Sequence, residues 1–502
     1  MEKSAEVILA RKDRVKDRIE QCKESVGDDS MDVEHPKAEG CQLDLFQDQV
    51  APSHHDATGD GGTGTGAVEV VQACAASEPG RALTDRLMEE ICRPENLNRA
   101  YKRVKANKGA PGMDGLTVDA LLDWLKVHKV PLLLSLLDGS YHPQPVRGVE
   151  IPKPFGGGMR QLGIPTVVDR LVQQAILQVL DPILDPTFST SSFGFRPGRS
   201  AHQALQQASA YVKAGRPIVV DMDLEKYFDR VNHDILMARL ARHITDKRLL
   251  RITRRFLQAG LMQNGVCIKR QEGTPQGGPL SPLLANLLLD DLDKELERRG
   301  HCFCRYADDC NIYVGSQAAG ERVLASITRF LEKKLKLRVN PKKSAVAKTM
   351  DRKFLGYRIL SGGRLGIAPA SLKRLKDRIR KITRRNRGVR FEQVIEELNR
   401  SLLGWIVYFR YAQAKTALQR IDEWMRRKLR CFRLKQWKRP QTIWKRLTQA
   451  GVSRREAANL ASSGKGWWRK ADTLAIHIAM PNRWFETLDL VNLTQQYLLL
   501  QH

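Results

Sequence analysis

The spacing of apolar residues changes period several times after residue 96, and each change marks a predicted element. Short strands are predicted at 149–153 and 161–164, with three glycines at 156–158 between them. Apolar residues then recur at helical spacing across 168–180, and Asp181-Pro182 is expected to end that helix. This part of the chain is therefore predicted to form a strand pair followed by a helix.

A second group of elements is predicted between residues 216 and 335. Residues 216–223 begin with a continuous apolar run, which is typical of a strand in a buried sheet, and a helix follows near 232–244. Two β-prone runs at 301–314 enclose an acid pair, which predicts a hairpin with the acids at its tip. Apolar spacing across 323–335 predicts another helix. Strand, helix, strand pair, helix and strand is the layout of a polymerase palm, so we expect an α+β fold.

The two ends of the chain differ from this middle part. After a charged opening, residues 1–80 lose all periodicity and pass through a glycine-rich run, which predicts a disordered acidic extension. From 368 to 440 only helical patterns occur, and the last sixty residues are short helical pieces. The predicted parts are an extension (1–80), fingers and palm of a right-hand polymerase with an antiparallel sheet (81–360), an all-helical thumb (361–445) and a small helical C-terminal segment (446–502).

The charge is unevenly distributed and indicates a polyanionic partner. The chain has a formal net charge of +28, yet residues 1–80 carry 8 Lys and Arg against 17 Asp and Glu. The remaining chain is therefore strongly basic, which favours nucleic acid over an acidic membrane surface. No apolar run approaches the length of a membrane span, so no membrane partner is expected. Nine cysteines at irregular spacing are too few for a disulfide framework and are expected to be reduced, in a cytoplasm.

The acid pair Asp308-Asp309 is the first candidate for catalysis. Carboxylates held at a hairpin tip can bind a pair of Mg²⁺ ions, the arrangement that nucleotidyl transfer requires. A third ligand would have to come from a neighbouring strand. Asp223 ends the buried strand about 85 residues earlier, but Asp221 faces the same side because side chains alternate with period two. Phe228 favours Asp223, because a ring five residues later could clash with a 2′-hydroxyl and so select deoxynucleotides.

Three further residues are predicted to contact the nucleotide. In the PQGG sequence at 275–278, Gln276 offers a donor and an acceptor where the two glycines let the backbone approach a base pair or phosphate. Ser281-Pro282 then begins a helix. Lys153 and Arg160 flank the glycine-rich turn, where they could neutralise and orient a triphosphate, although two exposed bases on a loop are common.

From about Asn96 to its end the chain resembles bacterial group II intron-encoded reverse transcriptases and maturases. The resemblance rests on NKGAPGMDG (107–115), EIPKP (150–154), RQLGIP (160–165), SFGFRPGR (192–199), DLEKYFDRVNHD (223–234), PQGG, RYADD (305–309) and FLGY (354–357). It implies that Asp223 and Asp308 hold two Mg²⁺ ions, with Asp309 a further candidate. It also implies dNTPs, a primer and target DNA as partners, and a phosphate contact from Lys342 or Lys343.

Residues 361–440 hold 23 Lys and Arg against 6 Asp and Glu, with aromatic residues interleaved. Bases for phosphates and rings for unstacked nucleotides suit an RNA ligand, although rings at helical spacing are also typical of a core. This region resembles the maturase domain that serves as thumb in the family, which implies binding of group II intron RNA. The predicted RNA contacts are Trp405, Arg410, Arg426, Arg427 and Arg430.

The sequence GKGWWR (464–469) resembles a short DNA-binding segment of the family, and no nuclease signature follows Pro440. We therefore expect priming from a pre-existing 3′ end. The predicted function is an RNA-directed DNA polymerase and maturase that promotes splicing and mobility of its intron. Two alternatives are a reverse transcriptase recruited to defence or repair, and a splicing cofactor with a vestigial polymerase. A genomic position inside a group II intron would separate them from the main prediction.

Overall fold

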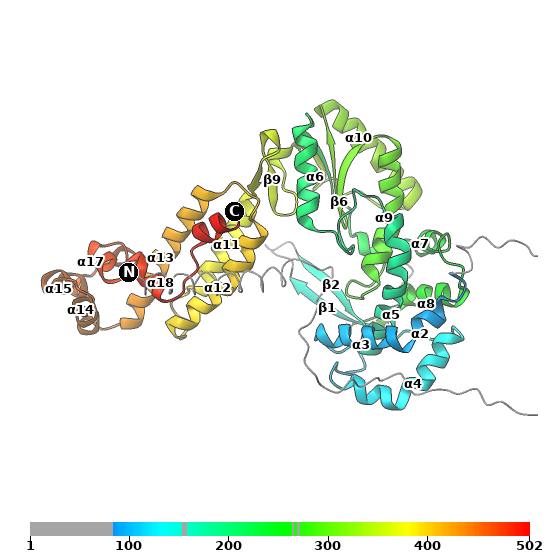
Figure 1. The fold of residues 1–502 in the computed structure, drawn as a ribbon, viewed down its shortest axis with the longest axis horizontal. Coiled ribbons are helices and arrows are strands. Elements are labelled where there is room, and N and C mark those ends of the chain that lie inside the picture. The colour runs from blue at the N-terminus through cyan, green and yellow to red at the C-terminus, as the bar shows by residue number, and fades with distance from the viewer. Residues whose placement is uncertain (1–83, 153–157, 264–265, 269–271, 502) are drawn as a thin grey trace, which may run out of the picture.

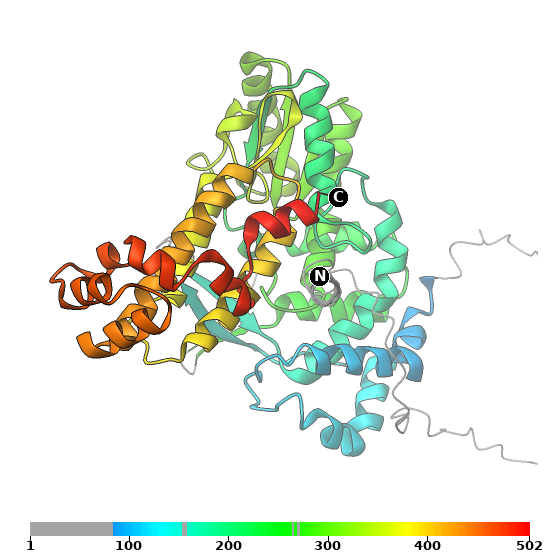
Figure 2. The same ribbon diagram turned by 60° about the vertical axis from the view of Figure 1, so that its left-hand side comes forward.

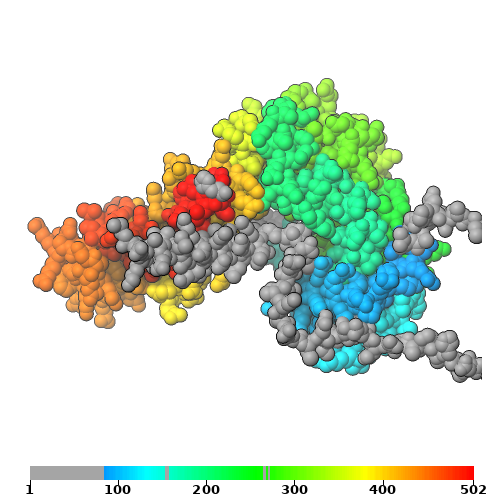
Figure 3. Space-filling view, viewed as in Figure 1, coloured from blue at the N-terminus to red at the C-terminus, as the bar shows by residue number. Residues whose placement is uncertain are grey.

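The computed structural model describes residues 84–152, 158–263, 266–268 and 272–501. The predicted extension (1–80) lies outside these residues. Within them, residues 84–360 form a body, and the residues after 361 form an arm that projects from it (Figure 1, Figure 3). No helix in these ranges is both long and apolar enough to cross a membrane.

The fingers combine helices with a four-stranded sheet of order β2-β1-β4-β5. Their elements are α2 (Leu87–Cys92), α3 (Pro94–Ala106), α4 (Leu121–Leu137), β1 (Val146–Pro152), β2 (Met159–Ile164), α5 (Val167–Leu184), β4 (Leu261–Gln263) and β5 (Val266–Ile268). The predicted strand pair is confirmed, because β1 and β2 are antiparallel neighbours that pair Ile151 with Arg160.

The predicted end of α5 at Asp181-Pro182 is wrong, because this helix continues to Leu184 with Pro182 inside it. A proline removes one backbone hydrogen bond, and so close to the end of the helix that loss affects only the last turn. At the other end, the Thr166 side chain accepts a hydrogen bond from the Asp169 backbone N–H. The fully buried apolar side chains of α5 belong to the larger hydrophobic core, which compensates for the interruption.

The palm is an antiparallel sheet of order β6-β7-β3-β8 covered by helices, as its sequence pattern predicts. Its elements are η3 (Asp185–Thr187), α6 (Ala201–Lys213), β3 (Ile218–Met222), η4 (Tyr227–Asp229), α7 (His233–Leu240), α8 (Lys247–Gln258), α9 (Ser281–Arg298), β6 (Cys302–Tyr306), β7 (Asp309–Val314), α10 (Gln317–Phe330), the π-helical turn η5 (Leu331–Leu335), β8 (Ala345–Lys348) and η6 (Thr349–Asp351). The predicted hairpin is β6–β7, and α9 begins at Ser281 with a proline in its first turn, as expected.

The arm contains the predicted helices and two separate packing units. After β9 (Tyr357–Ile359), η7 (Ser361–Gly363) and β10 (Leu365–Ile367) come α11 (Pro369–Ile382), α12 (Phe391–Tyr408), α13 (Lys415–Trp437), α14 (Pro440–Gln449), α15 (Arg454–Ser462), α16 (Trp467–Lys470), α17 (Leu474–Ala479), α18 (Asn482–Thr487) and α19 (Leu493–Leu499). The end of α13 and α14–α17 share a small core of their own.

The last helix does not continue outward with α14–α17 but returns to the thumb. In Figure 2 α19 lies across α12 and α13, and both helices contact it. The buried Asp422 carboxylate accepts hydrogen bonds from the backbone N–H groups of Leu493 (3.0 Å) and Thr494 (2.9 Å) and from the Thr494 hydroxyl (2.7 Å). Packing therefore divides this region differently from the predicted boundary at 446.

Candidate active site

The acid pair lies at a tight turn whose backbone is closely packed against a neighbouring loop. Tyr306 pairs with Asp309 across the β6–β7 hairpin, so Ala307 and Asp308 form its two-residue turn. Ala307 has a φ of +58°, a region that non-glycine residues seldom occupy and that often marks a functional site. A Cβ at Gly194 would lie 2.3 Å from the Ala307 backbone nitrogen, so only glycine lets this neighbouring loop approach the turn so closely.

Arg305 holds this turn from inside the protein. Its side chain is fully buried, and its Nε and Nη2 donate to the equally buried Asp293 carboxylate at 2.8 and 2.6 Å. Its Nη1 donates to the Ala307 carbonyl (3.0 Å) and to Asn286 Oδ1 (2.9 Å). The guanidinium therefore links helix α9 to the backbone that carries the acid pair.

Asp223 follows β3 directly and is also held by its backbone. Its N–H donates to the Ser344 hydroxyl (3.0 Å), and its carbonyl accepts from the Asn340 N–H (2.8 Å). The Lys343 ammonium lies 3.1 Å from the carboxylate. Lys343 is thus placed beside the predicted ligand, whereas the exposed Lys342 donates its backbone N–H to the Asn340 side chain.

Asp221 and Asp223 have different partners, a distinction that the alternation of side chains could not reveal. The Arg352 Nε donates to the Asp221 carboxylate (2.8 Å), and Nη2 lies 2.6 Å from the same carboxylate oxygen. Nη2 also donates to the Lys343 carbonyl (2.6 Å). The Arg352–Asp221 pair is more buried than the Lys343–Asp223 pair, and a buried, hydrogen-bonded ion pair is stronger than an exposed one, so Asp221 is less free to bind a cation.

The three predicted carboxylates lie within one another's electric field. Burial raises the pKa of the Asp308 carboxyl, and the charge of Asp223 raises it further. Burial likewise raises the pKa of Asp309 to about 6, with contributions from Asp308, Asp221 and Asp223. The site therefore concentrates negative charge that a bound cation would relieve.

The same site fits a divalent cation that takes part of its ligands from the substrate. No group of three or more His, Cys, Asp or Glu side chains in the described ranges is arranged to hold a metal ion. Mg²⁺ is commonly bound by one or two carboxylates together with substrate phosphates and water. A divalent cation at this site would take such oxygen ligands from Asp223 and Asp308, with Asp309 the further candidate.

Of the predicted nucleotide contacts on the fingers and the PQGG loop, Arg160 is the one whose charge reaches the acid pair. The charge of Arg160, which is exposed on β2, is close enough to Asp308 to lower its pKa against the effect of burial. The Gln276 carbonyl accepts from the Gly163 N–H (3.0 Å), which packs the PQGG loop on β2. The Phe228 carbonyl accepts from Thr274 (2.7 Å). The predicted contact Lys153 lies outside the residues that the structure describes.

The predicted RNA contacts of the thumb have different surroundings. Trp405 and Arg410 are half-buried, and the Arg410 guanidinium lies over the Tyr411 ring at 4.8 Å. Arg426 is half-buried and forms no ion pair with a described residue. Arg427 is tied to the C-terminal segment through Asp472 (2.9 Å) and the ring of Trp468 (4.2 Å).

Arg430 is the predicted RNA contact that the packing does not favour. Only 4% of this residue is exposed, and its Nε donates to the Met480 carbonyl (3.0 Å). Burial lowers the pKa of its guanidinium to about 10. The position gives Arg430 a role in joining α13 to the segment before α18, which is at odds with a phosphate contact.

Comparison with known proteins agrees with this geometry. Residues 151–359 match the family of reverse transcriptases (RNA-dependent DNA polymerases), and residues 372–451 match the group II intron maturase-specific domain. Protein YkfC of Escherichia coli (strain K12) is 35% identical over 328 residues, covering 57% of this chain and 85% of YkfC. Group II intron-encoded protein LtrA of Lactococcus lactis subsp. cremoris is 40% identical over 210 residues, covering 42% of this chain but only 35% of LtrA.

Solved structures are more distant. A chain of a partial Cas6-RT-Cas1–Cas2 complex is 26% identical with a TM-score of 0.33, covering 49% of this chain and 42% of that one.

The two family domains follow each other here in the order polymerase, then maturase, and the acid pair, Asp223 and the PQGG loop all lie in the first. The chain therefore belongs to the reverse transcriptases of the group II intron type, which join an RNA-dependent DNA polymerase domain to a maturase-specific domain.

Proposed function

We propose that this protein copies RNA into DNA by extending a primer 3′-hydroxyl with dNTPs, and that it binds a group II intron RNA to promote its splicing and mobility. The observation that carries the polymerase is the pairing of β3 with β7, which sets Met222 against Cys310 and so brings Asp223 to the same end of the sheet as Asp308 and Asp309. Reverse transcriptase domains in general use divalent metal ions. For this chain we propose two Mg²⁺ ions held by Asp223 and Asp308.

The proposed roles of the residues follow from their positions. Bound Mg²⁺ would activate the attacking hydroxyl and stabilise charge on the leaving pyrophosphate. Arg160 lies on β2 of the fingers, close enough to Asp308 to lower its pKa against the effect of burial, and its proposed role is to bind the triphosphate. Lys343 neutralises Asp223 in the cation-free protein, and its flexible amine can exchange this contact for a phosphate oxygen. Arg352 pairs with Asp221 and so leaves Asp223 as the freer carboxylate of this strand end.

Primer extension tests the polymerase directly. The purified protein is expected to extend a DNA primer annealed to an RNA template when given dNTPs and Mg²⁺, and to stop when a chelator is added. A protein that binds the primer and template but adds no nucleotide with Mg²⁺ or Mn²⁺ would contradict the proposal and favour a vestigial polymerase.

Splicing tests the maturase independently of DNA synthesis. The RNA of an intron that flanks the reading frame is expected to splice faster at low Mg²⁺ when the protein is present. The same RNA with a deleted protein-binding region serves as the control. Active DNA synthesis without any effect on splicing would favour a reverse transcriptase with another task.

Substitution of Phe228 tests the discrimination between sugars. Phe228→Ala is expected to reduce the preference for dNTPs over rNTPs by roughly 10-fold or more, because removing the ring removes a clash worth about 1–3 kcal/mol. Phe228→Tyr keeps the ring and is the matched control, so it should retain the preference. Single-nucleotide incorporation with dNTPs and rNTPs measures the effect. Equal preference in Phe228→Ala and the wild type would exclude Phe228 as the gate.

A further inference from the structure

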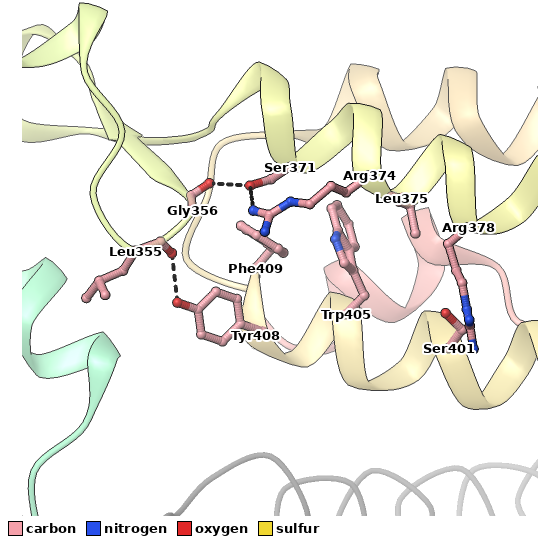
Figure 4. Close-up of a pocket in the computed structure, with 10 residues that line it drawn as sticks. All are labelled: Leu355, Gly356, Ser371, Arg374, Leu375, Arg378, Ser401, Trp405, Tyr408 and Phe409. Carbon is pink, nitrogen blue, oxygen red and sulfur yellow. Dashed lines mark hydrogen bonds between the residues drawn. The ribbon is translucent and has the colours of Figure 1, made fainter. Parts of the chain in front are cut away.

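A pocket of about 510 Å³ opens between α11 and α12, where the thumb joins the palm (Figure 4). Its lining comes from both thumb helices and from the loop that precedes β9. The lining residues are Leu355, Gly356, Ser371, Arg374, Leu375, Arg378, Ser401, Trp405, Tyr408 and Phe409. The volume falls within the range of small-molecule sites, which is large enough for one nucleotide.

One side of the pocket carries two cations without carboxylate partners. Arg374 and Arg378 lie one turn apart on α11, both are exposed, and neither forms an ion pair with any residue in the described ranges. The Arg374 guanidinium donates to the Ser371 hydroxyl (2.9 Å), which in turn donates to the Gly356 carbonyl (2.9 Å). Figure 4 shows this chain of hydrogen bonds, with the Arg374 side chain extending from α11 to Ser371 on the side of the pocket that faces Trp405 and Phe409.

The opposite side is aromatic. Trp405 is half-buried on α12, and its ring lies 4.6 Å from that of Phe409. The Tyr408 hydroxyl donates to the Leu355 carbonyl (2.7 Å), which fixes the wall nearest the palm. Trp405 therefore packs on Phe409 on one side and borders the pocket on the other, so a planar ligand could stack there.

We propose that this pocket binds one unstacked nucleotide of a nucleic-acid strand, with its base against Trp405 and its phosphate at Arg374 and Arg378. The inference rests on the proposed function, which brings RNA and DNA to the thumb. Aromatic rings bind unstacked bases, and guanidinium groups bind the phosphates beside them. An apolar peptide segment fits less well, because it would supply no anion to two guanidinium groups that form no ion pair with a described residue.

The position of the pocket places this nucleotide near the active site. Tyr408 and Trp405 pack in the same hydrophobic core as Tyr306, the residue that precedes the turn with the acid pair. Burial and the nearby Tyr306 raise the pKa of Tyr408, so a strand engaged at the acid pair would pass close to the thumb wall that carries the pocket. A nucleotide bound in the pocket would fix the position of its strand where the thumb joins the palm.

The test compares three nucleic-acid hairpins that differ at one position of the stem. One hairpin is fully paired, one has a single unpaired (bulged) nucleotide, and one has a bulged abasic residue at the same position. Fluorescence anisotropy at fixed salt gives each dissociation constant. The wild type is expected to bind the unpaired nucleotide about 10-fold more tightly than the abasic residue, since stacking on an aromatic ring contributes about 1–3 kcal/mol per base.

Two variants and one matched control separate the pocket from general electrostatics. Trp405→Leu is expected to bind both bulged probes equally, and Trp405→Phe, which keeps a ring, should retain part of the difference. Arg374→Ala with Arg378→Ala is expected to lose the preference for a bulge over the paired hairpin. Lys373→Ala with Lys376→Ala removes two exposed charges from the same helix outside the pocket, so it should weaken all probes alike.

The outcomes are distinguishable from a failure of the proposed function. An unchanged ratio between unpaired and abasic probes in Trp405→Leu would overturn the pocket, even if the protein polymerises normally. If Trp405→Leu does not fold, the variant Arg374→Ala with Arg378→Ala still tests the pocket, because it changes only exposed side chains. Running the probes as RNA and as DNA shows which strand supplies the nucleotide. A wild type that binds the probes with this preference but extends no primer would instead refute the polymerase alone.

Discussion

Asp308→Asn is expected to lower the rate of DNA synthesis by about 1000-fold or more, because removing a metal ligand costs several kcal/mol of transition-state stabilisation. The amide keeps the size of the side chain but loses the negative charge that the site concentrates around Asp223 and Asp309. Asp223→Asn is expected to have a similar effect. Single-turnover primer extension at saturating dNTP measures the loss.

The same variants should bind RNA as tightly as the wild type, because the basic surface of the arm is unchanged. Glu321→Gln removes an exposed carboxylate from α10 of the palm and is the matched control, so it should synthesise DNA at the normal rate. A smaller loss in Asp309→Asn than in Asp308→Asn would assign the direct ligand within the pair. Normal synthesis by Asp308→Asn would exclude the proposed site.

Much of the fold could be predicted from the sequence because its elements have strong local signals. The buried strand before Asp223, the hairpin around the acid pair and the helix after Ser281-Pro282 each combine a clear period with a turn or cap. The predicted end of α5 was wrong, because a proline near the end of a helix costs little stability when the remaining residues are buried. The return of α19 to the thumb depends on Asp422, a single acid 71 residues away from Leu493, which no local pattern indicates.

Pairing partners in the site were harder to predict than its acids. Arg352 lies 131 positions from Asp221, and nothing in its neighbourhood sets it apart from other basic residues. In the arm, composition gave the excess of bases but could not say which were buried. Arg430 is inside the fold, whereas Arg374 and Arg378, which were not among the predicted contacts, are exposed at a pocket.

Arg305 was visible in the motif but its role was not, because an arginine beside the acid pair suggests a phosphate contact and not a buried support. The structure places its charge in full burial against Asp293. Arg305→Met is therefore expected to destabilise the protein by about 3–5 kcal/mol, because Asp293 is left charged and unpaired in the core. The midpoint of denaturant unfolding, followed in the wild type and the variant, measures the change.

Replacing both partners separates the support of the fold from the support of the active site. In the double variant Arg305→Met with Asp293→Leu, neither charge remains buried, so most of the lost stability should return. DNA synthesis should nevertheless stay low, because the Ala307 carbonyl still lacks the guanidinium that holds the turn of the acid pair. A double variant that recovers both stability and synthesis would show that Arg305 serves the core alone, and that the turn is fixed by the close approach of Gly194.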